Sequence, residues 1–204
     1  MPLDGLLARV RACRVCVTSP NGLPLPHEPR PVIRASASAR IAICGQAPGT
    51  RVHASGLPFD DRSGDRLRDW MGVTRDEFYD DTLIATVPMG FCFPGTSKNG
   101  SDLPPRKECA PLWRTQVFAA LPHLKLRLLV GSYAIAWHLP QQARQPLGET
   151  VADWKRILED REGGCAMLPL PHPSWRNTGW LKTNPWFARD VLPVLRVRVR
   201  ALLR

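Results

Sequence analysis

Two short polar segments stand out in the sequence because each directly follows a short apolar run. The run at residues 40–44 leads into Gly45, Gln46, Ala47, Pro48 and Gly49. The run at residues 166–171 leads into a His-Pro-Ser sequence, whose polar members are His172 and Ser174. Short apolar runs bounded by turn residues predict buried parallel strands, and open α/β sheets bind ligands beyond the carboxyl ends of such strands. If the two strands are neighbours, we expect both segments to face one cleft.

In this order and at this spacing, the segments resemble the motifs of the uracil-DNA glycosylase superfamily, a Gly-x-x-Pro motif after the first strand and a His-Pro-Ser-like motif after the last. The resemblance includes residues 56–67, which are similar to the family's aromatic-containing loop and the helix that follows, and it runs roughly from Ala12 to Phe187. It is closest to the branch that binds an iron-sulfur cluster. It implies an enzyme that flips uracil or a related deaminated base out of DNA and excises it by hydrolysis in base-excision repair.

Breaking an N-glycosidic bond develops an oxocarbenium-like sugar, which a nearby carboxylate stabilises. The best-known glycosylase branch has an Asp where this chain has Ala47, and the cluster-binding branch often has an acid where this chain has Gln46. A related branch places a catalytic Asp in the loop after the aromatic residue, so the resemblance implies that Asp61 is the working acid. Asp60 is the alternative, and one of the two could instead cap the helix that begins near Ser63.

The resemblance also implies the other roles in the cleft. Phe59 is expected to stack on the flipped base, and His172 is expected to donate a hydrogen bond as negative charge develops on that base. Residues 45–49 serve as a backbone scaffold, with Gln46 in contact with the base. The remaining candidates are expected at the DNA surface, where Ser174 contacts a phosphate, Arg176 and Asn177 lie against the duplex, and Trp175 or Leu181 fills the vacated stack.

One departure from the cluster-binding branch concerns the choice of base. That branch usually follows its second strand with an Asn that reads the pyrimidine edge, but residues 84–90 of this chain contain none. The Thr86 hydroxyl or backbone groups near Met89 could read uracil instead or admit another deaminated base. The range of bases therefore stays open.

Six cysteines are too few and too scattered for a secreted disulfide scaffold. Four of them resemble, in their order, the cluster ligands of the iron-sulfur branch, and these are Cys13, Cys16, Cys92 and Cys109. Four thiolates suit a structural [4Fe-4S] cluster or a zinc ion, so both remain open, with the cluster as the first expectation. Cys44 and Cys165 fall on apolar runs and are expected to be buried residues.

Composition favours nucleic acid as the partner. The formal net charge of +10, from 28 Lys and Arg against 18 Asp and Glu, attracts a polyanion, although an Arg-rich composition can also reflect genomic base composition. We expect one domain over residues 1–204, acting as a monomer on uracil-containing DNA. No apolar run is long enough to span a bilayer, and the first residues do not start a secretory signal. We therefore expect a cytoplasmic, nucleoid-associated bacterial protein without a membrane partner.

Strands that alternate with helices predict an α/β fold, a three-layer α/β/α arrangement around a central four-stranded parallel sheet. Strands are expected at residues 40–44, 82–87, 126–130 and 166–171. Helices are expected at residues 3–10, 64–73, 110–121, 133–139, 150–158 and 183–203, the last of them kinked or divided at Pro193. Thr74 and Glu77 match a capping box at a further helix start, and irregular loops are expected at residues 20–31 and 92–105.

Two rival functions fit parts of the same sequence. A protein with this fold could bind uracil-containing or single-stranded DNA without cutting it, in which case the purified protein excises no base. A metal-dependent hydrolase could instead use His53, Asp61 and His172 as ligands, in which case these three side chains must converge. No lysine lies near the motifs to form a Schiff base, so the glycosylase interpretation is monofunctional.

Overall fold

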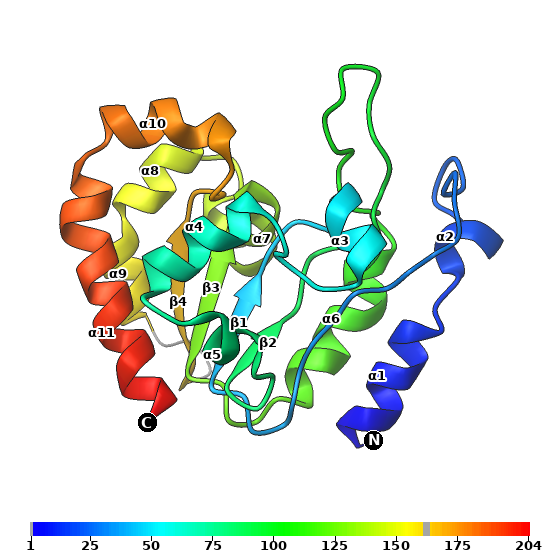
Figure 1. Cartoon of the computed structure of the whole chain (residues 1–204), viewed down its shortest axis with the longest axis horizontal. Coiled ribbons are helices and arrows are strands. Elements are labelled where there is room, and N and C mark those ends of the chain that lie inside the picture. Colours follow the sequence, from blue (N-terminus) through cyan, green and yellow to red (C-terminus); the bar gives the residue numbers. More distant parts are fainter. Residues whose placement is uncertain (1, 161–163) are drawn as a thin grey trace.

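The structure, a computed structural model, describes residues 2–160 and 164–204. Four strands form one parallel sheet in the order β2-β1-β3-β4 (Figure 1). They are β1 (Ile41–Cys44), β2 (Ile84–Thr86), β3 (Leu126–Val130) and β4 (Ala166–Leu170). All four predicted strands are confirmed. β2 is shorter than its predicted span because residues 80–83 form a turn, in which the Asp80 carbonyl accepts the N–H groups of Leu83 and Ile84.

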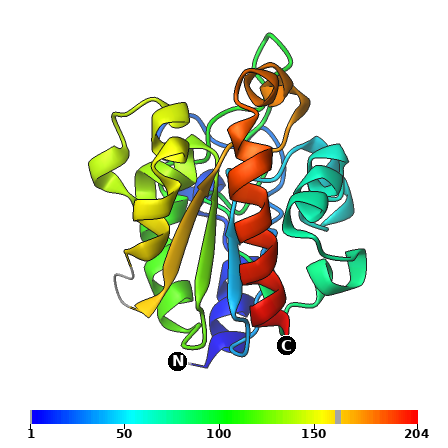
Figure 2. The same ribbon diagram turned by 90° about the vertical axis from the view of Figure 1, so that its left-hand side faces the viewer.

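The sheet is buried on both faces, as the apolar strands require. Ile41 and Ile43 of β1 face one layer, while Ala42 and Cys44 face the other. The first layer holds α4 (Arg62–Met71), α5 (Arg75–Tyr79) and α11 (Leu192–Leu203), and the second holds α1 (Leu3–Arg11), α6 (Cys109–Ala119) and α7 (Ser132–His138). Figure 2 shows α11 lying along one face of the sheet. The predicted three-layer α/β/α fold is confirmed.

Two predicted helices are divided in the structure. The predicted helix at residues 150–158 is α8 (Leu147–Ala152) followed by α9 (Trp154–Glu159), and the Asp153 carboxylate between them accepts a 2.7 Å hydrogen bond from Arg156. The predicted helix at residues 183–203 begins too early, because α10 (Thr178–Thr183) ends there and a π-helical turn, η4 (Phe187–Val191), follows. The predicted division at Pro193 is confirmed, since α11 begins at Leu192 and Pro193 has no N–H to continue an α-helical ladder across the junction.

The smaller helices include both predicted and unpredicted ones. The capping box of Thr74 and Glu77 is confirmed at the start of α5, with both reciprocal hydrogen bonds formed. Four short segments have no counterpart among the predicted helices, and these are α2 (Val15–Thr18), α3 (Thr50–Ser55), η1 (Pro140–Gln142) and η3 (Trp175–Asn177). In the described ranges, none of the helices has the length and apolar character needed to cross a membrane.

A buried polar pair supports the segment that leaves β2. The fully buried Arg114 of α6 donates to the carbonyls of Val87 and Pro88, at 2.7 Å each. Its other terminal nitrogen lies 2.6 Å from Nε2 of His138. A guanidinium can only donate, so Nε2 accepts and the imidazole is neutral. Burial lowers the pKa of His138 to about 3, and the charges of Arg114 and Arg127 act in the same direction.

This pair predicts an acid-sensitive fold. His138 takes up a proton near pH 6.5 when unfolded but only near its pKa of about 3 when folded, so its contribution to stability is complete above pH 6.5 and is lost as the pH falls. The free energy of unfolding should decrease by up to about 1.4 kcal/mol per pH unit below 6.5 on account of this residue. Denaturant titrations from pH 7 to pH 5 should show a shallower decrease for His138→Gln, which keeps an acceptor for Arg114. Equal slopes for the two proteins would contradict the prediction.

Candidate active site

A cleft with a volume of about 550 Å³ opens at the carboxyl edge of the sheet. Both polar segments line it, although the condition stated for this, that β1 and β4 are neighbours, is not met, since β3 lies between them. The segments still meet because parallel strands place all their carboxyl ends at the same edge of the sheet. Gly131, the residue after β3, lies between them beside His172. A Cβ added to Gly131, whose φ is +86°, would lie 3.6 Å from the Cβ of His172.

The first segment contributes mainly its backbone. The carbonyls of Gly45 and Gln46 accept hydrogen bonds from the N–H groups of Met89 and Gly90, both at 2.9 Å. The Met89 amide is therefore already paired, whereas Thr86 lines the cleft. Two groups were considered for contact with the base. Thr86 remains a candidate because it lines the cleft, whereas the Met89 N–H is not available because it already donates to the Gly45 carbonyl.

Phe59 forms a wall of the cleft. Its φ of 56° lies in the left-handed region, which is uncommon for a residue with a bulky side chain. A Cβ added to Gly45 would lie 3.2 Å from the Phe59 Cζ, so the ring packs tightly against this glycine. The ring meets Phe78 edge-on, with centroids 6.1 Å apart. It is half-buried, which leaves part of its surface open to the cleft.

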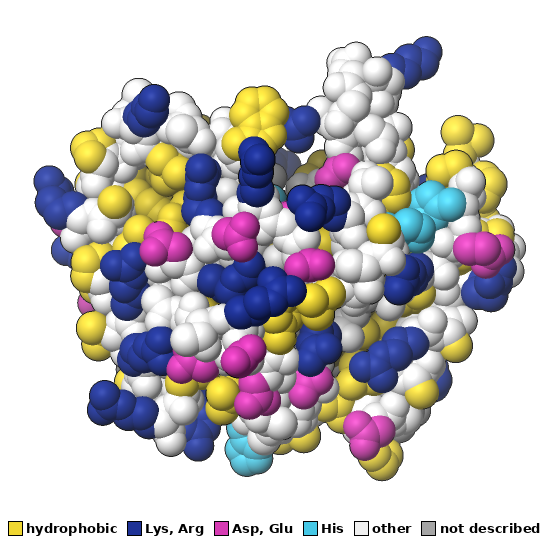
Figure 3. Space-filling view, viewed as in Figure 1, with side chains coloured by type: hydrophobic (Ala, Val, Ile, Leu, Met, Phe, Trp, Pro, Cys, Tyr) yellow, Lys and Arg dark blue, Asp and Glu magenta, His cyan; other side chains and the backbone are white. Residues whose placement is uncertain are grey.

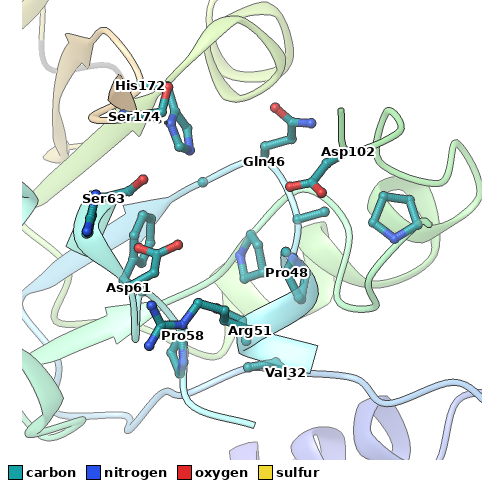
Figure 4. A pocket seen from close by; sticks show the side chains of 18 of the residues that line it. Val32, Gln46, Pro48, Arg51, Pro58, Asp61, Ser63, Asp102, His172 and Ser174 are labelled. Atoms are coloured by element: carbon teal, nitrogen blue, oxygen red, sulfur yellow. Dashed lines mark hydrogen bonds between the residues drawn. The ribbon is translucent and has the colours of Figure 1, made fainter. Parts of the chain in front are cut away.

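The two neighbouring carboxylates point in different directions. Asp61 lines the cleft and also caps α4, since its Oδ1 accepts the N–H of Gly64 at 2.9 Å. Asp60 forms an ion pair with Arg75 at 2.9 Å. Figure 4 shows the Asp61 carboxylate facing the cleft. Of the two candidates, Asp61 is the one placed to meet a substrate in the cleft.

His172 enters the cleft from the segment after β4 (Figure 4). Its Nδ1 accepts the N–H of Ser174 at 3.2 Å, and its carbonyl accepts the Asn177 side-chain amide at 2.7 Å. Burial lowers the pKa of His172, and the charge of Asp61 partly opposes this. The ring is therefore neutral at pH 7. Because Nδ1 is an acceptor, the single proton sits on Nε2, where it can be donated.

The predicted DNA-contacting residues occupy the rim. Ser174, Arg176 and Asn177 all line the cleft. Trp175 is 76% exposed there, whereas Leu181 packs against the core. Of the two proposed wedge residues, only Trp175 is placed where it can enter a duplex.

Three charged residues that line the cleft were missed by the sequence argument. Arg51 and Arg62 add two exposed cations, and Asp102 adds a second carboxylate. Basic side chains lie beside the hollow in Figure 3. The only sequence signal for Asp102 was its place in a loop flanked by two of the candidate cysteine ligands.

The four candidate ligands, Cys13, Cys16, Cys92 and Cys109, come from separate parts of the chain. We call them the cysteine set. The first precedes α2 and the second lies within it, the third lies in the loop after β2, and the fourth begins α6. The Cys13 thiol is half-buried, and the other three are buried. Cys44 and Cys165 are also buried, as expected.

The members of the cysteine set lie close enough to influence one another. Burial raises the pKa of the Cys109 thiol to about 12; the Phe91 N–H opposes that rise, and the other three members add to it. The Cys109 sulfur accepts this N–H at 3.3 Å, and the Cys13 sulfur accepts the Trp113 indole N–H at 3.4 Å. Over the described ranges, however, no group of three or more His, Cys, Asp or Glu side chains is arranged to hold a single metal ion.

The same finding gives no support to the metal-hydrolase rival, because His53, Asp61 and His172 share no common group among the described residues. His53 lies on α3, where its ring packs against His27 and Phe93 with centroids 4.5 Å and 5.7 Å away. It belongs to an aromatic cluster beside the cleft.

The arrangement as a whole matches what a base-excising enzyme needs, with an aromatic wall, a carboxylate and a neutral histidine donor in one cleft on a basic protein. A comparison with protein-family models agrees with this geometry. The model described as "Uracil DNA glycosylase superfamily" matches residues 33–196, which include every cleft residue described above. The chain belongs to the uracil-DNA glycosylase superfamily.

Proposed function

We propose that this protein is a monofunctional DNA glycosylase that excises uracil or a related deaminated base. Members of the superfamily act on DNA, and the observation that carries the proposal is the convergence of Phe59, Asp61 and His172 on one cleft. No lysine lines the cleft among the described residues. A Schiff-base lyase step needs such an amine, so hydrolysis is the reaction that these side chains favour.

Each of the three side chains has a part in this reaction. The flipped base stacks on Phe59, an interaction that does not depend on which base is present. As the glycosidic bond breaks, its electron pair moves to the base, and the Nε2–H of His172 stabilises the charge that develops there. Asp61 lies opposite the positive charge that develops on the sugar. Because Gly64 holds one of its carboxylate oxygens, this charge is positioned before the substrate arrives.

The rim of the cleft supports binding to duplex DNA. Arg51, Arg62 and Arg176 are exposed there and can pair with phosphates. The exposed Trp175 can occupy the space that a flipped nucleotide leaves, and the Arg176 guanidinium lies 5.5 Å from its ring. We further propose that the protein acts as a monomer on chromosomal DNA in the cytoplasm.

We also propose that the cysteine set holds a structural [4Fe-4S] cluster. The electrostatic influence of Cys13, Cys16 and Cys92 on the Cys109 thiol supports this proposal, because it brings the four thiols of the set into one neighbourhood. When bound, the cluster supplies a cross-link and no redox step, because hydrolysis transfers no electrons. It would join the N-terminal segment to the two ends of the loop between β2 and α6. A zinc ion is the alternative.

Metal analysis tests this proposal. Protein purified without oxygen should contain iron and acid-labile sulfide and show a broad visible absorbance, and Cys92→Ser should lose most of all three. Cys165→Ser is the matched control, because this buried thiol lies outside the set, and it should retain the iron. Stoichiometric zinc without sulfide would contradict the cluster proposal and show that the cysteine set binds a zinc ion instead.

An excision assay tests the proposed activity. Matched oligonucleotides carrying uracil, hypoxanthine or xanthine are incubated with the full chain, and abasic sites are revealed by alkaline cleavage. We expect excision of at least uracil, without strand cleavage before alkali. Tight binding to uracil-containing DNA with no excision of any base would favour the non-catalytic binder and overturn the proposal.

A further inference from the structure

A second carboxylate faces the cleft from the side opposite Asp61. Asp102 belongs to the loop that projects at the top of Figure 1, and Figure 4 shows its carboxylate beside Gln46. Backbone pairing fixes its position, because Thr96 and Asp102 form an antiparallel bridge and the Leu103 N–H donates to Gly95 at 2.9 Å. Asp102 is therefore held at the closed base of the loop.

This carboxylate lies directly against the first cleft segment. A Cβ added to Gly49 would lie 3.2 Å from the Asp102 Oδ2, so a side chain at position 49 would crowd it. The Gln46 side-chain amide donates to the Leu103 carbonyl at 3.5 Å, which links the segment to the same loop. Gln46 supplies no carboxylate of its own, and Asp102 places one next to it.

The chemical state of Asp102 differs from that of Asp61. Within the described part of the chain, no hydrogen bond or ion pair occupies the Asp102 carboxylate, whereas Gly64 occupies one oxygen of Asp61. Burial raises the pKa of Asp102, Arg176 opposes this, and Asp61 adds to the rise. These two residues supply the charges that act on it. A carboxylate that is free to accept and more basic than usual is suited to take a proton from water.

We propose that Asp102 is the general base that activates the attacking water, while Asp61 stabilises the sugar. This role rests on the proposed glycosylase function. The water oxygen forms a bond to C1′ of the deoxyribose as the bond from C1′ to the base nitrogen breaks. One water proton moves to the Asp102 carboxylate, and the bonding electron pair leaves with the base, whose charge His172 stabilises. Asp102 then releases its proton to the departing base or to solvent.

Single-turnover excision with Asp102→Asn tests this role. The rate should fall by about 10²-fold, while binding to DNA that carries a non-hydrolysable 2′-fluorinated deoxyuridine stays within about 3-fold of the wild type. The wild-type rate should fall on the acid side as Asp102 takes up a proton, and the residual rate of the variant should no longer follow that limb. Asp76→Asn, the same change at an exposed position of α5, should leave the rate and the pH profile unchanged.

Arg176→Gln provides a second readout. Removing this cation should raise the pKa of Asp102 further, so the acid limb should move to higher pH at saturating enzyme. A wild-type rate for Asp102→Asn, or a slow variant with an unchanged acid limb, would overturn the role of Asp102 and leave the glycosylase assignment intact. A wild-type protein that excises no base would overturn the proposed function, and the role of Asp102 with it.

Discussion

Replacing Asp61 with Asn should slow base excision by about 10²- to 10⁴-fold and leave the fold intact. Asn caps a helix about as well as Asp, so its amide oxygen can still accept the Gly64 N–H at the start of α4. The variant loses only the negative charge beside the sugar. Single-turnover rates on a uracil-containing duplex, with enzyme in excess, measure the effect of that charge on the chemical step.

Asp60→Asn is the matched control, because it is the same substitution one residue earlier. Asp60 is ion-paired with Arg75 in a partly exposed position, so its loss should cost less than about 1 kcal/mol of stability and should change the excision rate by less than about 3-fold. Thermal unfolding of both variants checks that they are folded. If Asp60→Asn excised the base slowly and Asp61→Asn excised it at the wild-type rate, Asp60 and not Asp61 would be the carboxylate that stabilises the sugar.

The fold was largely predictable because its signals are local. The run Leu126–Val130 is apolar except for Arg127 and lies between Lys125 and Gly131, and it forms β3 with the predicted limits. Thr74 and Glu77 carry all the chemistry of a capping box within four residues, so this helix start was also predictable. The division at Asp153 was not, because a single apolar stripe runs through both α8 and α9 and hides the junction.

The convergence of the two motifs was predictable, although the condition attached to it, that the two strands are neighbours, was not needed. Parallel strands place all their carboxyl ends at one edge, so Gly45 and His172 meet even though β3 separates their strands. The residue that follows β3, Gly131, has a φ of +86° and lies against His172, and such a contact between distant segments is one that no local pattern reports.

Asp102 could not be predicted because its position depends on contacts between distant segments. It lies in a loop rich in Gly, Ser and Pro, without periodicity, and such a loop predicts only irregular structure. Its approach to Gly49 crosses more than fifty positions of the chain. The conformation of Phe59 was hidden for a similar reason, since a positive φ at a bulky residue persists only when its surroundings enforce it.

Gly64→Ala should destabilise the protein by about 3 kcal/mol and reduce excision by about 10²-fold or more. A Cβ added at this position would lie 1.8 Å from the Phe59 carbonyl oxygen and 2.7 Å from its carbonyl carbon. Both atoms belong to the backbone, so the loop itself must move. That loop carries the Phe59 ring and the Asp61 carboxylate. Chemical denaturation measures the loss of stability, and single-turnover excision measures the displacement of the two side chains.

Gly179→Ala separates this steric effect from the general effect of replacing a helical glycine. Gly179 lies in α10 with open space where its Cβ would be, so alanine there should be neutral or should stabilise by up to about 1 kcal/mol. If Gly64→Ala behaved like Gly179→Ala, the tight approach of α4 to the Phe59 loop would be wrong. If it lost activity but kept full stability, the loop would have moved without strain. We expect Gly64→Ala to lose both stability and activity. This result would show that the close approach of Gly64 to the Phe59 backbone positions both the Phe59 ring and the Asp61 carboxylate.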